Sequence, residues 1–250
     1  MIYWHQFKPA SQFNMKQVGV MPQVSHDQGW NIFTQGEDFK GLIYNFDQRE
    51  KFPAEFIVPK LIANKKAKIS DFLQLGSLTI GTFIVSERCK LILDDLKIPD
   101  HQLYPAMAIF KNQELPYFIY HFYKSDNEYI NFETTRFKYF IPSRPNDLLI
   151  DQSAYEKYDP KVEFELLNIN EFRKRKSLIS EKFVGIGVTD LVLNAPPETP
   201  DLIYIKDCGV LSFFISDRMK EVLIDNKISA WAFNSQNSYN WNGNYNFISH

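Results

Sequence analysis

A stretch of sixteen residues that occurs twice constrains the fold more than any other feature of this sequence. The first copy, FIVSERCKLILDDLKI, spans residues 83–98, and the second, FFISDRMKEVLIDNKI, spans residues 213–228, which is 130 positions further along. Eight of the sixteen positions are identical in the two copies, among them a serine, an arginine and two lysines. The chain is therefore expected to form the same local structure twice.

Each copy predicts a short strand that leads directly into a helix. Aromatic and β-branched residues at 83–85 and 213–215 favour buried strands, and the serines that follow, Ser86 and Ser216, are favoured as helix N-caps. The acidic residue after each serine lies in the first helical turn, where the positive end of the helix dipole stabilises it. A lysine lies near the opposite end of each helix, where the dipole favours a positive charge.

The apolar residues of both predicted helices are spaced so that one face is buried. The expected buried positions are Cys89, Ile92, Leu93 and Leu96 in the first copy and Met219, Val222, Leu223 and Asn226 in the second. Residues 103–110 and 229–233 predict a strand after each helix. A period of 130 is too long for a solenoid, so we interpret the copies as an ancient duplication or as two similar packing units.

The Ser-acid-Arg triplet at the start of each predicted helix has a catalytic and a structural interpretation. A nucleophilic serine needs a base, and neither copy has a histidine or lysine placed by the sequence to act as one for Ser86 or Ser216. The capping role explains the triplet more simply, so we predict that both serines are structural.

The rest of the chain predicts short strands and one more helix. Residues 70–76, SDFLQLG, have the pattern of a short helix capped by a serine and ended by a glycine. Residues 117–123 and 137–141 are typical of strands joined as a hairpin or meander. Residues 191–207 predict a strand, a proline-rich turn and another strand. The expected fold class is α+β, with mixed or antiparallel sheets, a few short capped helices and two similar strand-helix-strand units.

The proline-rich stretch of residues 142–160 is the best candidate for a connection between two halves. We predict an N-terminal α+β half, residues 1–141, with the first strand-helix-strand unit. The C-terminal half, residues 142–250, contains the second unit and a terminal β-hairpin around Asn242-Gly243. One compact domain is also compatible with the pattern. Short apolar runs such as residues 41–46 suggest edge strands, but the sequence defines no fold for residues 1–80.

Composition and charge exclude several classes of protein. A formal charge of −2 and a pI near 6.2 give no strong attraction to nucleic acid or to an anionic membrane. No run approaches the roughly 20 apolar residues of a membrane span, and the N-terminus lacks the pattern of an export signal. The two cysteines, Cys89 and Cys208, are too few for a disulfide framework. We therefore expect a cytoplasmic protein with no nucleic-acid or membrane partner.

The residues that usually carry chemistry form no recognisable pattern. The five histidines are scattered without metal-ligand spacing, and the glycines at 185–188 lack the third glycine of a dinucleotide site. Asp94 and Asp95 are adjacent in a predicted helix and are better explained as solvent-facing. The basic run at 173–176 suits nucleic acid or an acidic partner, but a solvated helix face is the simpler explanation. We predict no catalytic, cofactor-binding or metal-binding residues.

A series of short motifs between residues 81 and 233 resembles immunity protein family eleven of the bacterial polymorphic toxin systems, or a sister immunity family. One motif is an Ile-Asp followed by a serine and an aromatic residue, here Ile150, Asp151, Ser153 and Tyr155. The other is a closing helix of the pattern I/V-S-D/E-R-hydrophobic-K, here residues 215–220, which leads to a final aromatic strand that ends at Phe233. The sequence departs from the pattern at Ala230-Trp231, where members commonly have a glycine.

This resemblance implies a cytosolic protein that binds a cognate toxin domain and blocks it without catalysis or cofactor. The sequence identifies neither the toxin nor the interface residues nor the oligomeric state. Two other hypotheses stay open. One is an enzyme whose site assembles only in three dimensions, and the other is a general protein-binding module that uses a sheet edge or the aromatic face near the C-terminus.

Overall fold

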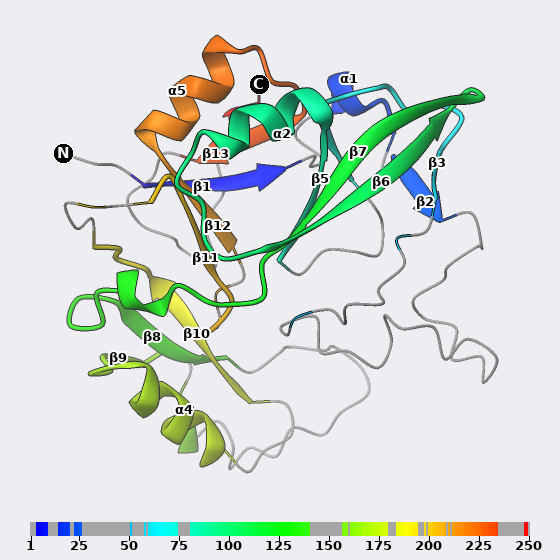
Figure 1. Cartoon of the computed structure of the whole chain (residues 1–250). Coiled ribbons are helices and arrows are strands. Elements are labelled where there is room, and N and C mark those ends of the chain that lie inside the picture. The colour runs from blue at the N-terminus through cyan, green and yellow to red at the C-terminus, as the bar shows by residue number, and fades with distance from the viewer. Residues whose placement is uncertain are drawn as a thin grey trace, which may run out of the picture.

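The structure is a computed structural model with strands in three sheets and a few short helices (Figure 1). The described residues are 4–9, 15–20, 23–26, 51, 58, 60–74, 81–140, 157–159, 161–179, 184–194, 198, 200–208, 210, 212–234 and 248–249. The α+β class predicted from the sequence is confirmed.

A five-stranded sheet contains the second copy of the repeat, in the strand order β11-β12-β1-β13-β14. Its strands are β1 (Trp4–Pro9), β11 (Leu202–Ile205), β12 (Ser212–Ser216), β13 (Trp231–Asn234) and β14 (Ile248–Ser249). All its neighbouring strands run antiparallel. The N-terminal strand β1 therefore lies in the centre of a sheet that is otherwise built from the C-terminal part of the chain.

A six-stranded sheet contains the first copy, in the strand order β2-β3-β6-β7-β5-β4. Its strands are β2 (Val24–His26), β3 (Leu61–Ala63), β4 (Phe72–Leu73), β5 (Thr82–Ser86), β6 (Gln102–Phe110) and β7 (Gln113–His121). Strands β6 and β7 form the long hairpin at the upper right of Figure 1. Only the β3–β6 pair is parallel among the described pairs of this sheet.

A three-stranded sheet and the helices complete the described fold. The sheet has the order β10-β8-β9. Its strands are β8 (Arg136–Phe140), β9 (Glu163–Phe164) and β10 (Gly185–Asp190), and the helices are α1 (Met15–Val18), α2 (Glu87–Asp94), the 3-10 helix η2 (Asn127–Tyr129), α4 (Ile169–Ser177) and α5 (Asp217–Asp225). Helices α2 and α5 lie together at the top of Figure 1, and α4 lies with the three-stranded sheet at the bottom.

The two copies of the repeat form the same strand-helix-strand unit, as the sequence predicts. The first unit is β5–α2–β6 and the second is β12–α5–β13. The offset of 130 also holds in the strand pairing, because Phe72 pairs with Val85 and Leu202 pairs with Ile215. Each unit therefore includes one further strand, β4 or β11, beside its first strand.

The strand that lies between the two strands of each unit comes from a different part of the chain in the two units. In the first unit β7 lies between β5 and β6, and it is antiparallel to both. In the second unit β1 occupies the equivalent place between β12 and β13, again antiparallel to both. Strand β7 follows β6 after a two-residue turn, whereas β1 is the first strand among the described residues. The N-terminus thus completes the C-terminal unit.

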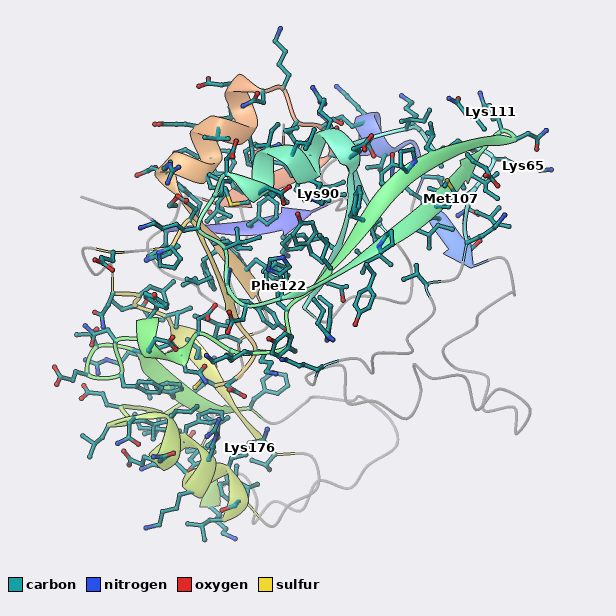
Figure 2. The ribbon with its side chains drawn as sticks, in the orientation of Figure 1. Lys65, Lys90, Met107, Lys111, Phe122 and Lys176 are labelled. Carbon is teal, nitrogen blue, oxygen red and sulfur yellow. The ribbon has the colours of Figure 1, made fainter. Side chains whose placement is uncertain are left out.

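The largest hydrophobic core lies where the two units meet. Phe83 and Phe213, which are equivalent residues of the repeat, have ring centroids 4.7 Å apart. Phe122, labelled in Figure 2, contacts both rings, at 4.9 Å and 5.3 Å. Further members come from both helices and from β1, including Phe7, Cys89, Leu93, Met219 and Leu223. The apolar faces of the repeated helices therefore pack into one shared core.

Two further cores use the remaining sheet faces. One joins the five-stranded sheet to the three-stranded sheet and α4, with Trp4, Phe214, Phe137, Ile186 and Phe172 among its buried members. The other lies on the second face of the six-stranded sheet and includes Leu61, Ile84 and Ile119. Alternate residues of the repeated strands thus point into different cores, as the two-residue period of a strand requires.

The helix predicted for residues 70–76 is wrong. Phe72 and Leu73 form β4 and pair with β5, and the hydroxyl of Ser70 donates to the carbonyl of Phe72 (2.8 Å) instead of capping a helix. The local cap signal is overridden because the neighbouring strand offers backbone partners and the side chains of Phe72 and Leu73 are buried on both faces.

The hairpin or meander predicted between residues 117–123 and 137–141 is also wrong, although both strands exist. Strand β7 pairs with β5 and β6, and β8 pairs with β9 and β10 in another sheet. The strand predicted at 191–193 is displaced as well. Residues 185–190 form β10, and Leu193 makes only an isolated bridge with Ile130. Strand propensity identified these segments but not their partners.

Several other predictions have mixed outcomes. Cys89, Leu93, Met219 and Leu223 are buried as predicted, but Asn226 is exposed and caps the C-terminal end of α5. The strand predicted at 41–46, most of the connection predicted at 142–160 and the hairpin at Asn242-Gly243 lie outside the described residues.

The last turn of α5 ends in a Schellman motif that contains a lysine where glycine is usual. The N–H of Ile228 donates to the carbonyl of Leu223, and the N–H of Lys227 donates to that of Ile224, both at 2.9 Å. Lys227 is exposed and has a φ of 51°, in the left-handed region. Its equivalent in the first unit, Lys97, has no positive φ. Identical residues of the repeat therefore adopt different backbone conformations.

We expect the substitution Lys227→Gly to raise the free energy of unfolding by about 0.5–1 kcal/mol, because glycine removes the strain of a left-handed side-chain-bearing residue. The matched substitution Lys97→Gly should lower it by a similar amount, since there glycine only adds freedom to the unfolded chain. Urea unfolding of the two variants and the wild type measures both effects. A change of the same sign in both variants would contradict this explanation.

Candidate functional site

The two serines of the repeat cap the N-termini of their helices, as predicted. The hydroxyl oxygen of Ser86 accepts a hydrogen bond from the backbone N–H of Cys89 (3.2 Å), and that of Ser216 accepts one from Met219 (3.1 Å). Both serines have extended backbone conformations typical of an N-cap. The same geometry in both copies explains why the serine occurs twice.

Each serine also donates a hydrogen bond to a buried aspartate that precedes it by fifteen residues. The distance from Ser86 Oγ to Asp71 Oδ1 is 2.8 Å, and that from Ser216 Oγ to Asp201 Oδ1 is 3.0 Å. Both aspartates lie outside the sixteen-residue repeat, and the sequence interpretation missed them. The signal was available, because Asp71 and Asp201 are themselves 130 positions apart and each precedes two apolar residues.

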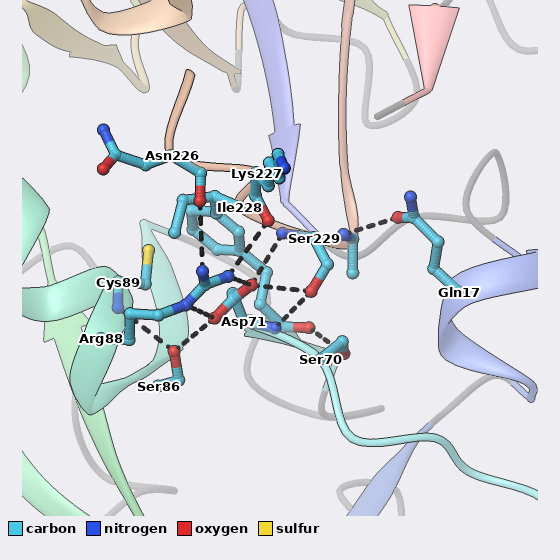
Figure 3. A network of polar contacts seen from close by, with 12 residues as sticks. Gln17, Ser70, Asp71, Ser86, Arg88, Cys89, Asn226, Lys227, Ile228 and Ser229 are labelled. Carbon is cyan, nitrogen blue, oxygen red and sulfur yellow. Dashed lines mark hydrogen bonds and ion pairs between the residues drawn. The ribbon is translucent and has the colours of Figure 1, made fainter. Parts of the chain in front are cut away.

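The repeated arginines connect these aspartates to the helix of the other unit. Arg88 donates from Nη2 to Asp71 Oδ2 (2.7 Å), and its guanidinium also donates to the backbone carbonyls of Asn226 and Lys227, each at 3.1 Å (Figure 3). These carbonyls belong to the C-terminal end of α5, where the helix dipole favours a positive charge. Arg88 therefore binds the end of a helix that lies more than 130 residues away in the sequence.

The second cluster repeats this arrangement in the opposite direction. Arg218 donates from Nη1 to Asp201 Oδ2 (3.1 Å) and from Nη2 to the carbonyl of Asp95 (3.4 Å) at the C-terminal end of α2. Each Asp-Ser-Arg cluster thus combines the start of its own helix with the end of the other helix. The two clusters form a reciprocal pair of links between the units.

The aspartates also bind the backbone that follows the other helix. Asp71 Oδ2 accepts hydrogen bonds from the N–H and the hydroxyl of Ser229, both at 2.8 Å. Asp201 Oδ2 accepts one from the N–H of Lys97 (2.9 Å). Backbone bonds run beside them, from Phe72 N to Ser229 O (3.3 Å) and from Asp201 N to Lys97 O (2.6 Å). Each aspartate is therefore the acceptor at the centre of its cluster.

The electrostatics of the first cluster favour the ionised form of the Asp71 carboxyl. Burial alone would raise the pKa of Asp71, but the hydrogen bonds from Arg88, Ser229 and Ser86 outweigh it and hold the pKa below its ordinary value of 3.8. Burial raises the pKa of the neighbouring Cys89 thiol well above its ordinary value. An ionised aspartate of low basicity and a neutral, buried thiol suit a structural link better than nucleophilic chemistry.

A second group of charges occurs only in the second unit. Asp217 Oδ1 lies 2.7 Å from His5 Nε2 and 2.9 Å from Lys220 Nζ, and the latter two atoms are 3.0 Å apart. Burial lowers the pKa of His5, and the charge of Lys220 lowers it further, against the opposing effect of Asp217. In the first unit Phe118 takes the place of His5 in the strand register. These contacts hold β1 against the first turn of α5.

Asp126 is the one carboxyl group in the described residues whose pKa is raised to near neutrality. Burial raises it from 3.8 to about 6. Its Oδ2 accepts a hydrogen bond from the N–H of Tyr204 (2.8 Å), and its own N–H donates to the carbonyl of Tyr204 (2.8 Å). Asp126 thereby attaches the segment before η2 to β11. Raised carboxyl pKa values also occur at active sites, but the hydrogen-bond partner of the Asp126 carboxyl here is a backbone N–H.

Three of the four residues in the basic run of α4 are exposed, in agreement with the solvated-face interpretation, whereas Arg175 is half-buried over the ring of Phe164. Arg173 and Arg175 make ion pairs with Asp207 (3.6 Å) and Glu171 (3.7 Å). Lys174 is exposed, and so is Lys176, which is labelled in Figure 2. Among the residues that the structure describes, no three histidine, cysteine or acidic side chains gather as a metal site would require. In the same residues, no helix is long and apolar enough to cross a membrane.

Of the two motifs that resemble the immunity proteins, one can be placed. Residues 150–155 lie outside the described residues. The closing motif forms the end of β12 and the start of α5, with Ser216 as N-cap, Arg218 as the link and Met219 in the core. At Ala230, near where the family commonly has glycine, φ is 65°. The left-handed backbone gives a physical reason for a glycine at this turn.

Comparison with known proteins adds no family: no protein-family model matches the chain, and no curated protein matches it either. The argument for function therefore depends on the motifs and on the contacts described above.

We expect Asp126 to make stability depend on pH. The pKa of Asp126 is about 6 in the folded state and 3.8, the ordinary value, in the unfolded chain. The contribution of the protonated carboxyl to the free energy of unfolding is therefore fully present below about pH 4 and is lost as the pH rises through 6. Between about pH 4 and pH 7 the wild type should lose up to about 3 kcal/mol more unfolding free energy than Asp126→Asn. Urea unfolding across this range measures the difference, with the exposed Asp225→Asn as control. Parallel curves for the wild type and Asp126→Asn would refute the assignment.

Proposed function

We propose that this protein is an immunity protein of a bacterial polymorphic toxin system, which binds a cognate toxin domain in the cytoplasm and blocks it without catalysis. The observation that carries the proposal is the role of the closing motif. In both copies the serine is a helix N-cap and the arginine links the two units. The hydrophobic residue that follows the arginine lies in the shared core. The motif by which the chain resembles the family therefore defines a scaffold.

The same contacts favour binding over chemistry. The Ser-acid-Arg triplets were the best sequence candidates for a reactive site, and Ser86 and Ser216 each use both the hydroxyl hydrogen and an oxygen lone pair within the clusters. A serine that donates to a buried aspartate and also caps a helix has a structural role. What stays available for recognition is the exterior of the molecule.

The exterior offers suitable anchors for a protein partner. Leu167 and Leu178, at the two ends of α4, are 79% and 69% exposed, and the cationic Lys174 and Lys176 lie between them. Leu91 on α2 is 63% exposed. Apolar side chains beside charges are the kind of group from which a few residues supply most of the binding energy of an interface. These features support a protein-binding function.

The proposal predicts stoichiometric protection. Co-expression with the toxin domain encoded next to this gene should restore growth of a sensitive host, and the purified proteins should form a complex. In a titration of toxin activity, protection should be complete at about one molecule per toxin molecule, because a blocker acts by occupancy. Ser86→Ala and Ser216→Ala should each protect as well as the wild type once folded.

Two results would contradict the proposal. Protection at far below one molecule per toxin would indicate turnover of the toxin or its product. Loss of protection in a folded Ser86→Ala or Ser216→Ala variant would place that serine in the functional mechanism.

A further inference from the structure

The place of β1 in the five-stranded sheet suggests an interaction that does not depend on the proposed function. We propose that the groove between β12 and β13 is a strand-binding site that accepts either the chain's own β1 or the β1 of a second copy, so that two copies exchange N-terminal strands.

The groove offers backbone partners on both sides. Residues 4–7 pair with β12, from Trp4 opposite Ser216 to Phe7 opposite Phe213. Residues 6–9 pair with β13, from Gln6 opposite Asn234 to Pro9 opposite Trp231. Without β1, both β12 and β13 would present unpaired backbone edges, which are templates for pairing with another extended segment.

Side chains on both faces of β1 make the site selective for this strand. On one face the ring of Phe7 lies 5.5 Å, 5.9 Å and 6.1 Å from those of Phe72, Trp231 and Phe83. On the other face Trp4 Nε1 donates to the carbonyl of Asn194 (3.1 Å). From the same face Gln6 Nε2 donates to Ser212 Oγ (2.8 Å).

An occupant must therefore present large aromatic groups to two cores and an amide to Ser212. The N-terminus of a second copy meets all of these requirements.

The equivalent strand of the first unit shows why β1 can exchange and β7 cannot. Lys111 and Asn112 both have positive φ (47° and 69°) and form the two-residue turn between β6 and β7. This turn keeps β7 beside β6 of its own chain. Strand β1 is joined by no hairpin to either of its partners. Exchange would preserve every contact of β1, which makes strand swapping a low-cost route to a dimer.

Two single-cysteine variants of the full chain test the exchange. Lys8 and Ala232 face each other across β1 and β13, at a Cα separation that antiparallel pairs share with disulfides. A mixture of Lys8→Cys chains and Ala232→Cys chains is unfolded in denaturant, refolded at high protein concentration and oxidised. The native Cys89 and Cys208 are buried and have raised thiol pKa values, so they compete poorly.

The first unit supplies the matched control. Gln102 and His121 are the equivalent facing pair on β6 and β7. A mixture of Gln102→Cys and His121→Cys chains cannot form a disulfide between two chains in this way, because the turn keeps β7 beside β6 of its own chain. We expect at least about ten-fold more covalent heterodimer from the Lys8/Ala232 mixture than from this control, increasing with protein concentration as mass action requires.

The double variant with Lys8→Cys and Ala232→Cys in one chain verifies that the pair closes a disulfide. If that bond forms and the Lys8/Ala232 mixture gives no more heterodimer than the control, the proposal is wrong. If either single variant does not fold, as judged by circular dichroism, the facing pair His5→Cys and Ile215→Cys on β1 and β12 replaces it and is held to the same criterion.

Discussion

The structure depends on two buried carboxylates, each of which accepts hydrogen bonds from both halves of a duplicated unit. Asp71 and Asp201 bind the cap serine and the arginine of their own unit and the backbone that follows the helix of the other. A buried charge is tolerated only when it is paired and hydrogen-bonded, so the two units must meet in this arrangement for either aspartate to be satisfied. The polar clusters thereby orient the helices above their shared aromatic core.

The similarity of the two units also explains the position of the N-terminal strand. In the second unit β1 takes the place that β7 has in the first, between β12 and β13. Its strand pairings join residues more than 200 positions apart, and the Asp71–Ser229 contact joins residues 158 apart. Such non-local contacts form late in folding because loop closure costs entropy first. The N-terminal strand is consequently the element that another copy can most readily supply.

Local features of this fold were predictable from sequence, and its pairings were not. The N-cap roles of Ser86 and Ser216 and the buried helix faces follow from short-range rules that hold wherever the helix packs. Asp71 and Asp201 were missed because their role depends on a cap serine fifteen residues away and on the opposite helix end. Ser70 satisfies a helix-cap pattern, yet β4 forms there because β5 offers a partner. The segment at 117–123 was assigned to a hairpin with 137–141, since propensity does not reveal that its neighbours are β5 and β6.

Under the proposed function, the closing motif holds the two units together and the partner is recognised by other residues on the surface. Hydrogen exchange tests the reciprocal links most directly. In Asp71→Ala the account predicts that the Ser229 amide, in the opposite unit, exchanges faster than in the wild type. In Asp201→Ala it predicts the same for the Lys97 amide. In each variant the acceleration at that amide should exceed the acceleration at the other amide by more than about ten-fold. Equal acceleration at both amides in each variant, or none in either, would contradict the claim that each aspartate secures the other unit's helix end.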